Sequence, residues 1–207
     1  MKNGLISILV VVCVIFLGIG LGAAVNHATN STPSINSTKV GYTLNLVVKM
    51  EWYNASVGYA AKYMVLEKNG SLGSSAKINL PASQVIRIDI VSYDQGISPP
   101  YLQSYANVKG TISNSMILTT GNSTMNSSLS GSQALQVSSV NCGEITHTFS
   151  LGINSTLLNI PVEAGHNVTA YFELNNVGIY DWWCMCPCGE AAMSTPGWMI
   201  GEVDIVT

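Results

Sequence analysis

The chain has 207 residues, which is enough to bury one sizeable hydrophobic core. With 47% hydrophobic and only 9% charged residues, its composition argues against disorder and favours a globular domain with an uncharged polar surface. All eight Lys and Arg residues fall within residues 1–109, and residues 110–207 carry seven acids and no basic side chain. Such a distribution argues against nucleic-acid binding, because half of the chain has nothing with which to contact phosphates.

The N-terminal segment, residues 1–25, is predicted to be a membrane anchor. An uncharged run extends from Leu5 to Val25, and its 21 residues match the roughly 20 that span a bilayer as a helix. The core of a secretory signal is usually shorter, at about 7–15 residues. We therefore expect a retained single-pass helix in the cell membrane, with Lys2 inside and the rest of the chain on the extracytoplasmic face. The alternative is cleavage after the small residues 22–24.

Residues 26–41 are rich in Asn, Ser, Thr and Pro, which is typical of a linker. Eight Asn-x-Ser/Thr triplets follow the hydrophobic segment, and they fit a glycosylated outer surface, although such triplets also arise by chance in this composition. An exported chain could in addition form disulfides. The candidate glycosylation sites are Asn30, Asn36, Asn54, Asn69, Asn122, Asn126, Asn154 and Asn167.

Residues 42–207 are predicted to form one all-β domain with less than a tenth helix. Short β-rich runs alternate with turns, and in the run 145–151 the two-residue period places His147 on the same face as Phe149, toward the core. Several such strands predict an antiparallel Greek-key β-sandwich or barrel. The predicted strands are 42–50, 57–66, 84–92, 145–151, 168–174, 177–183 and 202–206.

Residues 180–199 concentrate the chemically distinctive side chains. They contain three of the five Cys, three of the eight Met and three of the four Trp residues. Thiolate and thioether sulfurs are soft ligands that select copper, and the Pro-Cys-Gly corner at 187–189 can turn several of them inward. An inward His147 needs partners for its ring nitrogens, and a metal held jointly with this loop would supply one. The alternative is a core histidine that bonds to the backbone.

Several of these segments together resemble the cupredoxin fold. They are the Ile-Thr-His-Thr-Phe run at 145–149, the segments 160–165 and 178–180, and the Cys-x-x-x-Cys-Gly run at 184–189. The form is similar above all to the copper A domain of cytochrome c oxidase subunit II, a family in which an N-terminal membrane segment is usual. The resemblance covers residues 145–206.

This resemblance implies a copper site. In it His147 matches the family's first histidine ligand, and Cys184 and Cys188 match the two bridging thiolates. Met199 matches the methionine ligand, and the backbone carbonyl of Cys186 matches the weak carbonyl ligand. Copper is therefore the expected cofactor.

The family's second histidine is absent, because Pro196 stands three residues before Met199 and the other histidines are His27 and His166. The chain also resembles sulfocyanin, an archaeal membrane-anchored blue copper protein, and blue copper sites likewise use two histidines. We expect either a sulfur-rich site, in which Met193 or Met199 supplements the remaining ligands, or a fold that has lost its copper. If copper is bound, we expect a preference for Cu(I).

Two hypotheses of function follow. The first is a membrane-anchored, extracytoplasmic copper-binding protein for electron transfer, similar to oxidase subunit II, whose partners are respiratory oxidase subunits or a redox carrier. The second is a structural surface glycoprotein without metal, stapled by disulfides. No motif typical of a hydrolase or a phosphate-binding enzyme is present, so a stand-alone enzyme is the weaker interpretation. The cysteines available for two disulfides are Cys142, Cys184, Cys186 and Cys188.

Overall fold

The computed structural model describes residues 39–96, 103–120, 134–153 and 156–207. All of them belong to one compact unit, Thr32–Thr207. The predicted anchor 1–25 and residues 26–38 of the linker lie outside the described residues. Among the helices in the described ranges, none is long and apolar enough to cross a membrane.

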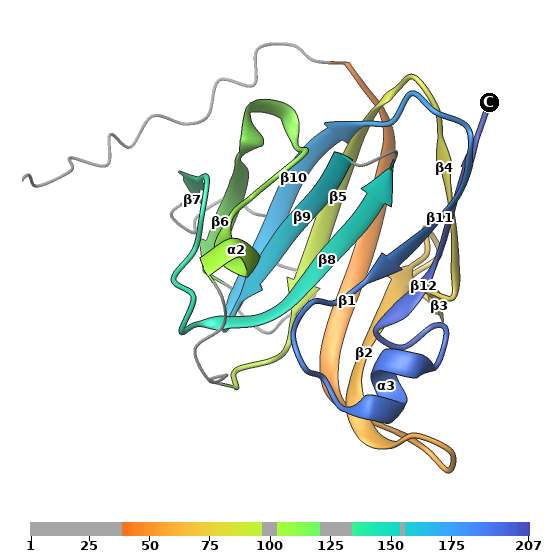
Figure 1. The fold of residues 1–207 in the computed structure, drawn as a ribbon, viewed down its shortest axis with the longest axis vertical. Coiled ribbons are helices and arrows are strands. Elements are labelled where there is room, and N and C mark those ends of the chain that lie inside the picture. Colours follow the sequence, from red (N-terminus) through yellow and green to blue (C-terminus); the bar gives the residue numbers. More distant parts are fainter. Residues whose placement is uncertain (1–38, 97–102, 121–133, 154–155) are drawn as a thin grey trace, which may run out of the picture. The chain divides into compact units, whose positions relative to one another are not determined.

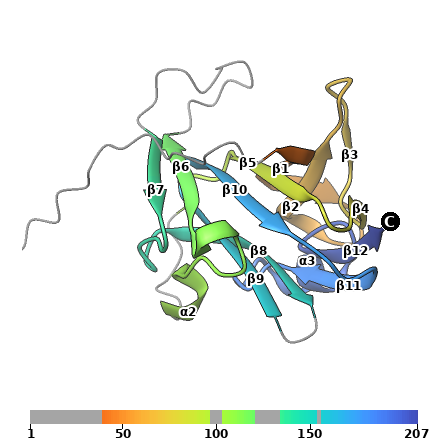
Figure 2. The same cartoon turned by 90° about the horizontal axis from the view of Figure 1, so that it is seen from above.

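Two β-sheets build the domain, and they lie face to face (Figures 1 and 2). The first contains β1 (Val40–Asn54), β2 (Gly58–Leu66), β3 (Leu72–Ser74), β5 (Val85–Ser92), β6 (Met116–Thr120), β7 (Ala134–Val137) and β10 (His166–Glu173). The second contains β4 (Lys77–Pro81), β8 (Ile145–Ile153), β9 (Thr156–Glu163), β11 (Gly178–Trp183) and β12 (Ile200–Val206). The strand orders are β3-β2-β1-β5-β10-β6-β7 and β4-β12-β11-β8-β9.

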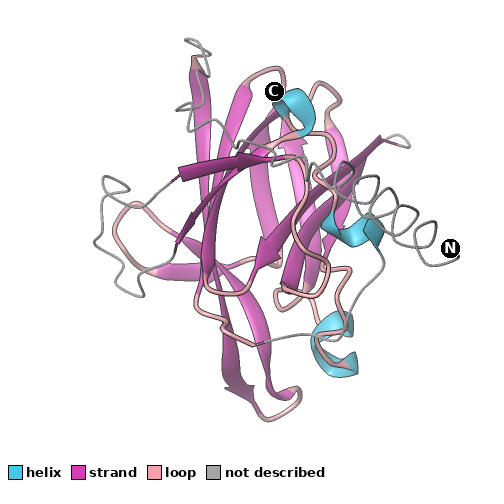
Figure 3. Cartoon of the chain, turned by 90° about the vertical axis from the view of Figure 1, so that its left-hand side faces the viewer, coloured by secondary structure: helices cyan, strands magenta, loops and turns pink. Residues whose placement is uncertain are grey.

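Helices are short in the described part of the chain and lie in the connections between strands (Figure 3). They are α2 (Gln103–Ala106), the 3-10 turn η1 (Ile112–Asn114) and α3 (Glu190–Ser194), with four, three and five residues. The prediction of an essentially all-β domain is therefore confirmed.

The sheets are mixed, so the prediction of a purely antiparallel sandwich is wrong in two pairings. β1 pairs with β5 in parallel, and β12 pairs with β4 in parallel. Between β1 and β5 the chain forms β2 and β3 and then crosses to the second sheet as β4. Parallel neighbours need such a crossover, and the alternation within a strand does not show which neighbour it will take.

The core lies between the two sheets and follows the predicted alternation. In β5 the side chains of Ile86, Ile88 and Ile90 are fully buried, whereas Arg87 and Asp89 are half-buried and form an ion pair of 2.8 Å. In β8 the side chains of the predicted inward face are buried, and so are the intervening Thr and Ser side chains. Two of these are hydrogen-bonded, because Thr148 Oγ1 accepts from the Met185 amide and Ser150 Oγ donates to Asn159 Oδ1. His147 is thus buried and is only 2% exposed.

Three of the candidate glycosylation sites lie in the described ranges. Asn54 and Asn69 are exposed at turns, where the side-chain oxygen of each accepts a hydrogen bond from the backbone two residues later. Asn167 is half-buried at the start of β10, and its Oδ1 accepts from the Ser92 amide. The other five sites lie outside the described residues.

Candidate metal centre

Neighbouring strands of the second sheet bring His147 and Cys184 to the same end of the domain. His147 lies in β8, and Cys184 follows β11, which pairs with β8 through Trp182 and Trp183. Two hydrogen bonds continue this contact beyond the end of β11. The Thr148 amide donates to Cys184 Sγ at 3.3 Å, and the Met185 amide donates to Thr148 Oγ1 at 2.8 Å.

Backbone hydrogen bonds fold the loop between β11 and β12 back on itself. The Cys184 amide donates to the Met199 carbonyl, and the Met199 amide donates to the Ala192 carbonyl. The loop turns into α3 at Gly189, whose φ of +94° lies in a region that side-chain-bearing residues rarely adopt. The loop thereby holds Cys188 opposite His147, near the start of β8.

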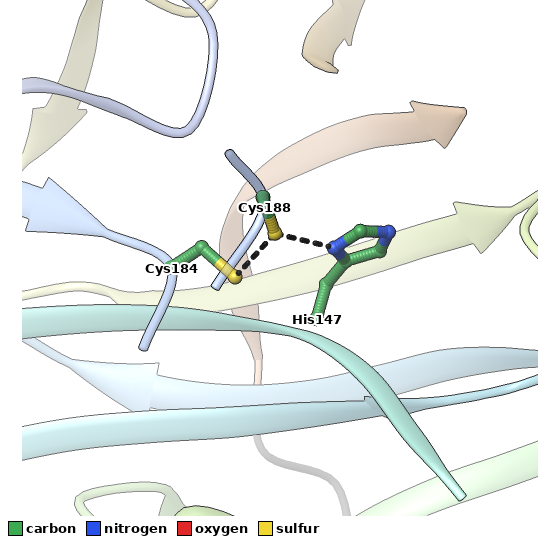
Figure 4. Close-up of side chains that lie close together, drawn as sticks. All are labelled: His147, Cys184 and Cys188. Carbon is green, nitrogen blue, oxygen red and sulfur yellow. Dashed lines mark hydrogen bonds between the residues drawn. The ribbon is translucent and has the colours of Figure 1, made fainter. Parts of the chain in front are cut away.

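Three ligand atoms converge here (Figure 4). His147 Nδ1 lies 3.2 Å from Cys188 Sγ, which lies 3.5 Å from Cys184 Sγ, and all three atoms are within 4.8 Å of one another. His147 and Cys184 are buried and Cys188 is half-buried. In the described residues all four cysteines are free, so none of the disulfides that the glycoprotein hypothesis uses is present there.

These distances fit a shared metal ion. A disulfide would bring its sulfurs to about 2.05 Å, far closer than the observed 3.5 Å. A tetrahedral ion with bonds of about 2.3 Å to sulfur and about 2.0–2.1 Å to nitrogen would hold its ligand atoms about 3.6–3.8 Å apart. The observed separations of 3.5 and 3.2 Å are slightly smaller, so a modest expansion would admit an ion.

Asp94 orients the histidine from the opposite side. Its Oδ2 lies 2.9 Å from His147 Nε2, and its Oδ1 accepts from the Gly96 amide at 2.7 Å. The carboxylate can only accept, so Nε2 carries the proton, and Nδ1 is the nitrogen that faces the sulfurs. Carboxylates in this position fix the tautomer of metal-bound histidines and raise their basicity.

His147 and Asp94 each shift the pKa of the other. Burial lowers the pKa of His147, but the hydrogen bond to Asp94 and the Cys184 sulfur outweigh burial and raise that pKa to about 9. Burial raises the pKa of the Asp94 carboxyl, but the bonds from His147 and Gly96 lower it below its ordinary value. Without metal, the ring is therefore an imidazolium paired with a carboxylate at neutral pH.

The three loop thiols share one negative charge. Burial raises the pKa of Cys184, but hydrogen bonds from Cys186, Cys188 and His147 outweigh burial and hold that pKa well below its usual range. The pKa values of Cys186 and Cys188 are raised, first by their bonds to Cys184 and then by burial. Cys184 is thus the thiolate of the metal-free site. Its negative charge is one that a bound cation would neutralise.

The structure places the remaining predicted ligands around this group. Met199 is fully buried and is bonded through its backbone to Cys184. Cys186 is fully buried beside Cys184, but it is not among the three atoms that converge with His147. Met193 is half-buried on α3. His166 lies at the start of β10, where Nδ1 is 2.9 Å from the Ala164 carbonyl, so it does not replace the missing histidine.

A second titratable pair lies near β8, the strand that carries His147: Glu163 ends β9, and Glu144 comes just before β8. Glu163 is buried, 3.8 Å from His166, and its carboxyl interacts with that of Glu144. Burial, and then the Glu144 carboxyl, raise the pKa of Glu163 to about 7. The folded domain therefore holds this proton across a pH range in which the unfolded chain releases it.

We expect replacement of this carboxyl, Glu163→Gln, to stabilise the domain at pH 8 and to leave it nearly unchanged at pH 4. The raised pKa contributes stability that is complete below the unfolded value of about 4.5 and is lost as the pH rises through about 7. The amide keeps the uncharged form at every pH, so the variant should gain on the order of 1–2 kcal/mol at pH 8 after allowance for solvent screening. Urea unfolding at both pH values measures this difference. Glu173→Gln, at an exposed position, is the control, and equal stability of variant and parent at pH 8 would contradict the expectation.

Comparison with known proteins finds similar structures only. No protein-family model matches the chain, and neither does any curated protein sequence. The similar structures include cupredoxins and domains of oxidase subunit II. Rusticyanin from Thiobacillus ferrooxidans is 10% identical with a TM-score of 0.33, and the match covers 79% of this chain and 76% of rusticyanin. Auracyanin B is 14% identical with a TM-score of 0.30 and coverage of 81% and 91%.

The periplasmic domain of subunit II of cytochrome oxidase from Bradyrhizobium japonicum is 13% identical, with a TM-score of 0.33 and coverage of 81% and 86%. These are the types of protein that the sequence resembles. At such identities and TM-scores a likeness carries no function over to this chain. The function proposed below therefore rests on the chain's own residues.

Proposed function

We propose that this chain is a copper-binding electron-transfer protein with a sulfur-rich site. The observation that carries the proposal is the convergence of His147 Nδ1, Cys184 Sγ and Cys188 Sγ inside the core, with Asp94 bonded to the far side of the ring. Two thiolates and one imidazole are a soft donor set, which favours copper over hard cations such as magnesium or calcium. Bound copper would supply a one-electron couple between Cu(I) and Cu(II).

The protein's own residues suit that couple. His147 and Cys184 are buried, so water has little access to two of the three donors. The Thr148 amide donates to Cys184 Sγ, and this hydrogen bond would help to hold the thiolate in place in both oxidation states of copper. The tight backbone bonds of the loop would also limit rearrangement of the cysteines when an electron arrives or leaves. Met199 would complete the coordination, and Cys186 and Met193 are the further candidate ligands.

Cu(I) is the oxidation state that this donor set favours. With one histidine in place of two, most of the donors are sulfurs, and soft donors select the monovalent ion. A mixed-valence pair of coppers bridged by two cysteines, as in the copper A domain that the sequence resembles, would then lack its usual second imidazole. We therefore expect no seven-line resonance from a delocalised pair.

The setting of this domain is also part of the proposal. The uncharged run 5–25 would anchor the chain in the cell membrane, with the domain on the extracytoplasmic face and sugars on its Asn-x-Ser/Thr triplets. A membrane-held electron carrier there would exchange electrons with respiratory oxidase subunits or with a redox carrier. A one-electron couple at copper makes and breaks no bond in a substrate, so we propose a carrier or oxidase subunit rather than a stand-alone enzyme.

Metal analysis of the full-length chain tests this function. The purified chain is loaded with copper or zinc, dialysed and examined by metal content and by visible and electron-spin-resonance spectra. We expect copper to be retained, with tighter binding of Cu(I) than of Cu(II) under matched conditions. Failure to retain copper, or retention of zinc in preference to copper, would contradict the proposal. A seven-line resonance would leave copper binding intact but show that another residue replaces the second histidine.

A further inference from the structure

A chain of buried hydrogen bonds runs from the cysteine loop along β8 to β9. The Met185 amide donates to Thr148 Oγ1 at 2.8 Å, and Thr148 Oγ1 lies 2.9 Å from Ser150 Oγ. Ser150 Oγ in turn donates to Asn159 Oδ1 at 2.8 Å. The side chains of Thr148, Ser150 and Asn159 are all fully buried. Buried polar groups cost free energy unless each finds a partner, so the orientation of every group in this chain matters.

The two ends of the chain fix the direction of every bond in it. An amide N–H can only donate, so Thr148 Oγ1 accepts from Met185. At the other end, Asn159 Nδ2 donates to two backbone carbonyls in the segment 105–107, at 3.0 and 2.8 Å, which leaves Asn159 Oδ1 to accept. Ser150 therefore donates to Asn159, and Thr148 donates to Ser150. Each hydroxyl both accepts and donates, and a hydroxyl that donates onward is the stronger acceptor.

Asn159 is a firm anchor for this chain of bonds. It lies in β9, directly opposite Ser150 of β8. Its backbone exchanges two hydrogen bonds with that of Lys109, at 3.0 and 2.9 Å, in addition to the two bonds that its side-chain nitrogen donates. The segment 105–109 is in turn tied to residues 138–140 by two backbone hydrogen bonds. Asn159 therefore cannot shift without breaking several bonds at once.

The other end of the chain acts on the candidate ligand Cys184. Met185 follows Cys184 directly, so the bond to Thr148 Oγ1 holds the backbone of this ligand against β8. The Thr148 amide also donates to Cys184 Sγ at 3.3 Å. Hydroxyl and amide of one residue thus fix both the backbone and the sulfur of Cys184, which lies 3.5 Å from Cys188 Sγ. Thr148 can hold the loop only as firmly as its own hydroxyl is held, and Ser150 accepts from that hydroxyl.

We propose that Ser150, anchored by Asn159, is a positioning residue of the candidate metal centre. It acts through Thr148, because accepting the Thr148 hydroxyl proton turns a lone pair of Oγ1 toward the Met185 amide. The inference rests on the proposed function, since the group that is positioned there is a copper ligand. Hydrogen bonds that orient metal ligands contribute about 10–100-fold to metal affinity. Ser150 lies further from the ligand, so its effect should be smaller than that.

Removal of the hydroxyl, by Ser150→Ala in the full-length chain, tests the inference. In the metal-free protein, we expect hydrogen exchange of the Met185 amide, measured by nuclear magnetic resonance, to become about 2- to 10-fold faster. Affinity for Cu(I), measured by competition with a chelator, should fall by about the same factor. Circular dichroism shows whether the variant is folded. Unchanged exchange of the Met185 amide in a folded variant would overturn the inference, with the proposed function left standing.

Ser150→Cys is the conservative variant. Its thiol is a weak donor and a weak acceptor, so exchange of the Met185 amide in the metal-free protein should rise less than in Ser150→Ala. This variant also carries the test if Ser150→Ala fails to fold. Exchange as slow as in the parent in both variants would show that the loop does not depend on this chain of bonds.

A double variant separates action through Thr148 from a general loosening of the fold. Thr148→Val removes the hydroxyl that accepts from the Met185 amide. If Ser150 acts through that hydroxyl, adding Ser150→Ala to Thr148→Val should change neither the exchange of this amide nor the affinity for Cu(I) any further. A role in stability alone would add its full effect in both backgrounds, and that result would overturn the inference.

Thr169→Val is the control for loss of a buried hydroxyl elsewhere. Thr169 lies in β10 of the first sheet, where its buried Oγ1 donates to Asp89. This variant should leave the exchange of the Met185 amide and the affinity for Cu(I) unchanged. Effects equal to those of Ser150→Ala would overturn the inference. If the parent itself retains no copper, the proposed function fails, and exchange of the Met185 amide, which needs no metal, still decides whether Ser150 holds the cysteine loop.

Discussion

Replacement of Cys184 by serine should abolish tight copper binding, and so should replacement of His147 by alanine. Each change removes one of the three donor atoms that converge within 4.8 Å. Loss of an outer partner of a metal ligand costs about 10–100-fold in affinity, and loss of the ligand itself should cost more than that. Competition with a Cu(I) chelator measures the effect in the full-length chain.

The chain supplies matched controls for both substitutions. Cys142→Ser makes the same chemical change at a half-buried cysteine outside the group, and His166→Ala does so at a histidine that bonds to the Ala164 carbonyl. Both controls should bind copper as the parent does. Circular dichroism and urea unfolding show whether each variant is folded. Parent-like binding by folded Cys184→Ser or His147→Ala would show that the assignment of that ligand is wrong.

Strand alternation was sufficient to predict the direction of His147. His147 and Phe149 lie on one face of β8, as the two-residue period requires, because the rings of both meet the ring of Tyr63 in the facing sheet. The prediction that the cysteines converge with His147 came from the resemblance of their spacing to that of a known family. Spacing could indicate it because β8 and β11 are neighbours in one sheet and fix where the following loop lies.

The partners from the other sheet could not be predicted in this way. Asp94 lies 53 residues before His147, just after β5 of the first sheet, and Tyr63 lies in β2 of that sheet. Their contacts with His147 form only when the two sheets pack face to face. No local sequence pattern encodes which residues meet across that interface. The position of Asp94 after β5 therefore gave no indication that it contacts His147.

Four of the five strands that the sequence did not predict lie at the edges of sheets, and β6, between β10 and β7, is the exception. β3 has three residues, β7 has four, and β9 is an edge strand of the second sheet. Pro161 within β9 argues against a central strand, since it cannot donate to a sheet, but an edge strand tolerates it. The same edge places Glu163 beside Ile145 of β8. Sequence alone therefore recovered the central strands better than the borders of the fold.

Neutralising the carboxylate behind the histidine, by Asp94→Asn, should weaken copper binding about 10–100-fold at pH 9. The amide retains an oxygen for the Gly96 amide, but it lacks the charge that raises the pKa of His147 to about 9. Burial then dominates and the ring becomes a weaker base. A weaker base is a poorer donor to copper, and it is no longer held firmly in the tautomer with its proton on Nε2.

The loss caused by Asp94→Asn should shrink as the pH falls from 9 toward 6.5. In the parent, a proton competes with copper for His147 below about pH 9, so its apparent affinity falls as the solution becomes more acidic. In the variant the pKa is lower, and that competition begins only at a lower pH. Competition with a copper chelator at pH 9 and at pH 6.5 measures the affinity for copper. The imidazole nitrogen resonances of the metal-free protein report the pKa of His147. Asp181→Asn, an exposed acid of β11, is the control and should bind as the parent does at both values. An equal loss at the two pH values would show that Asp94 only positions the ring and does not set its charge.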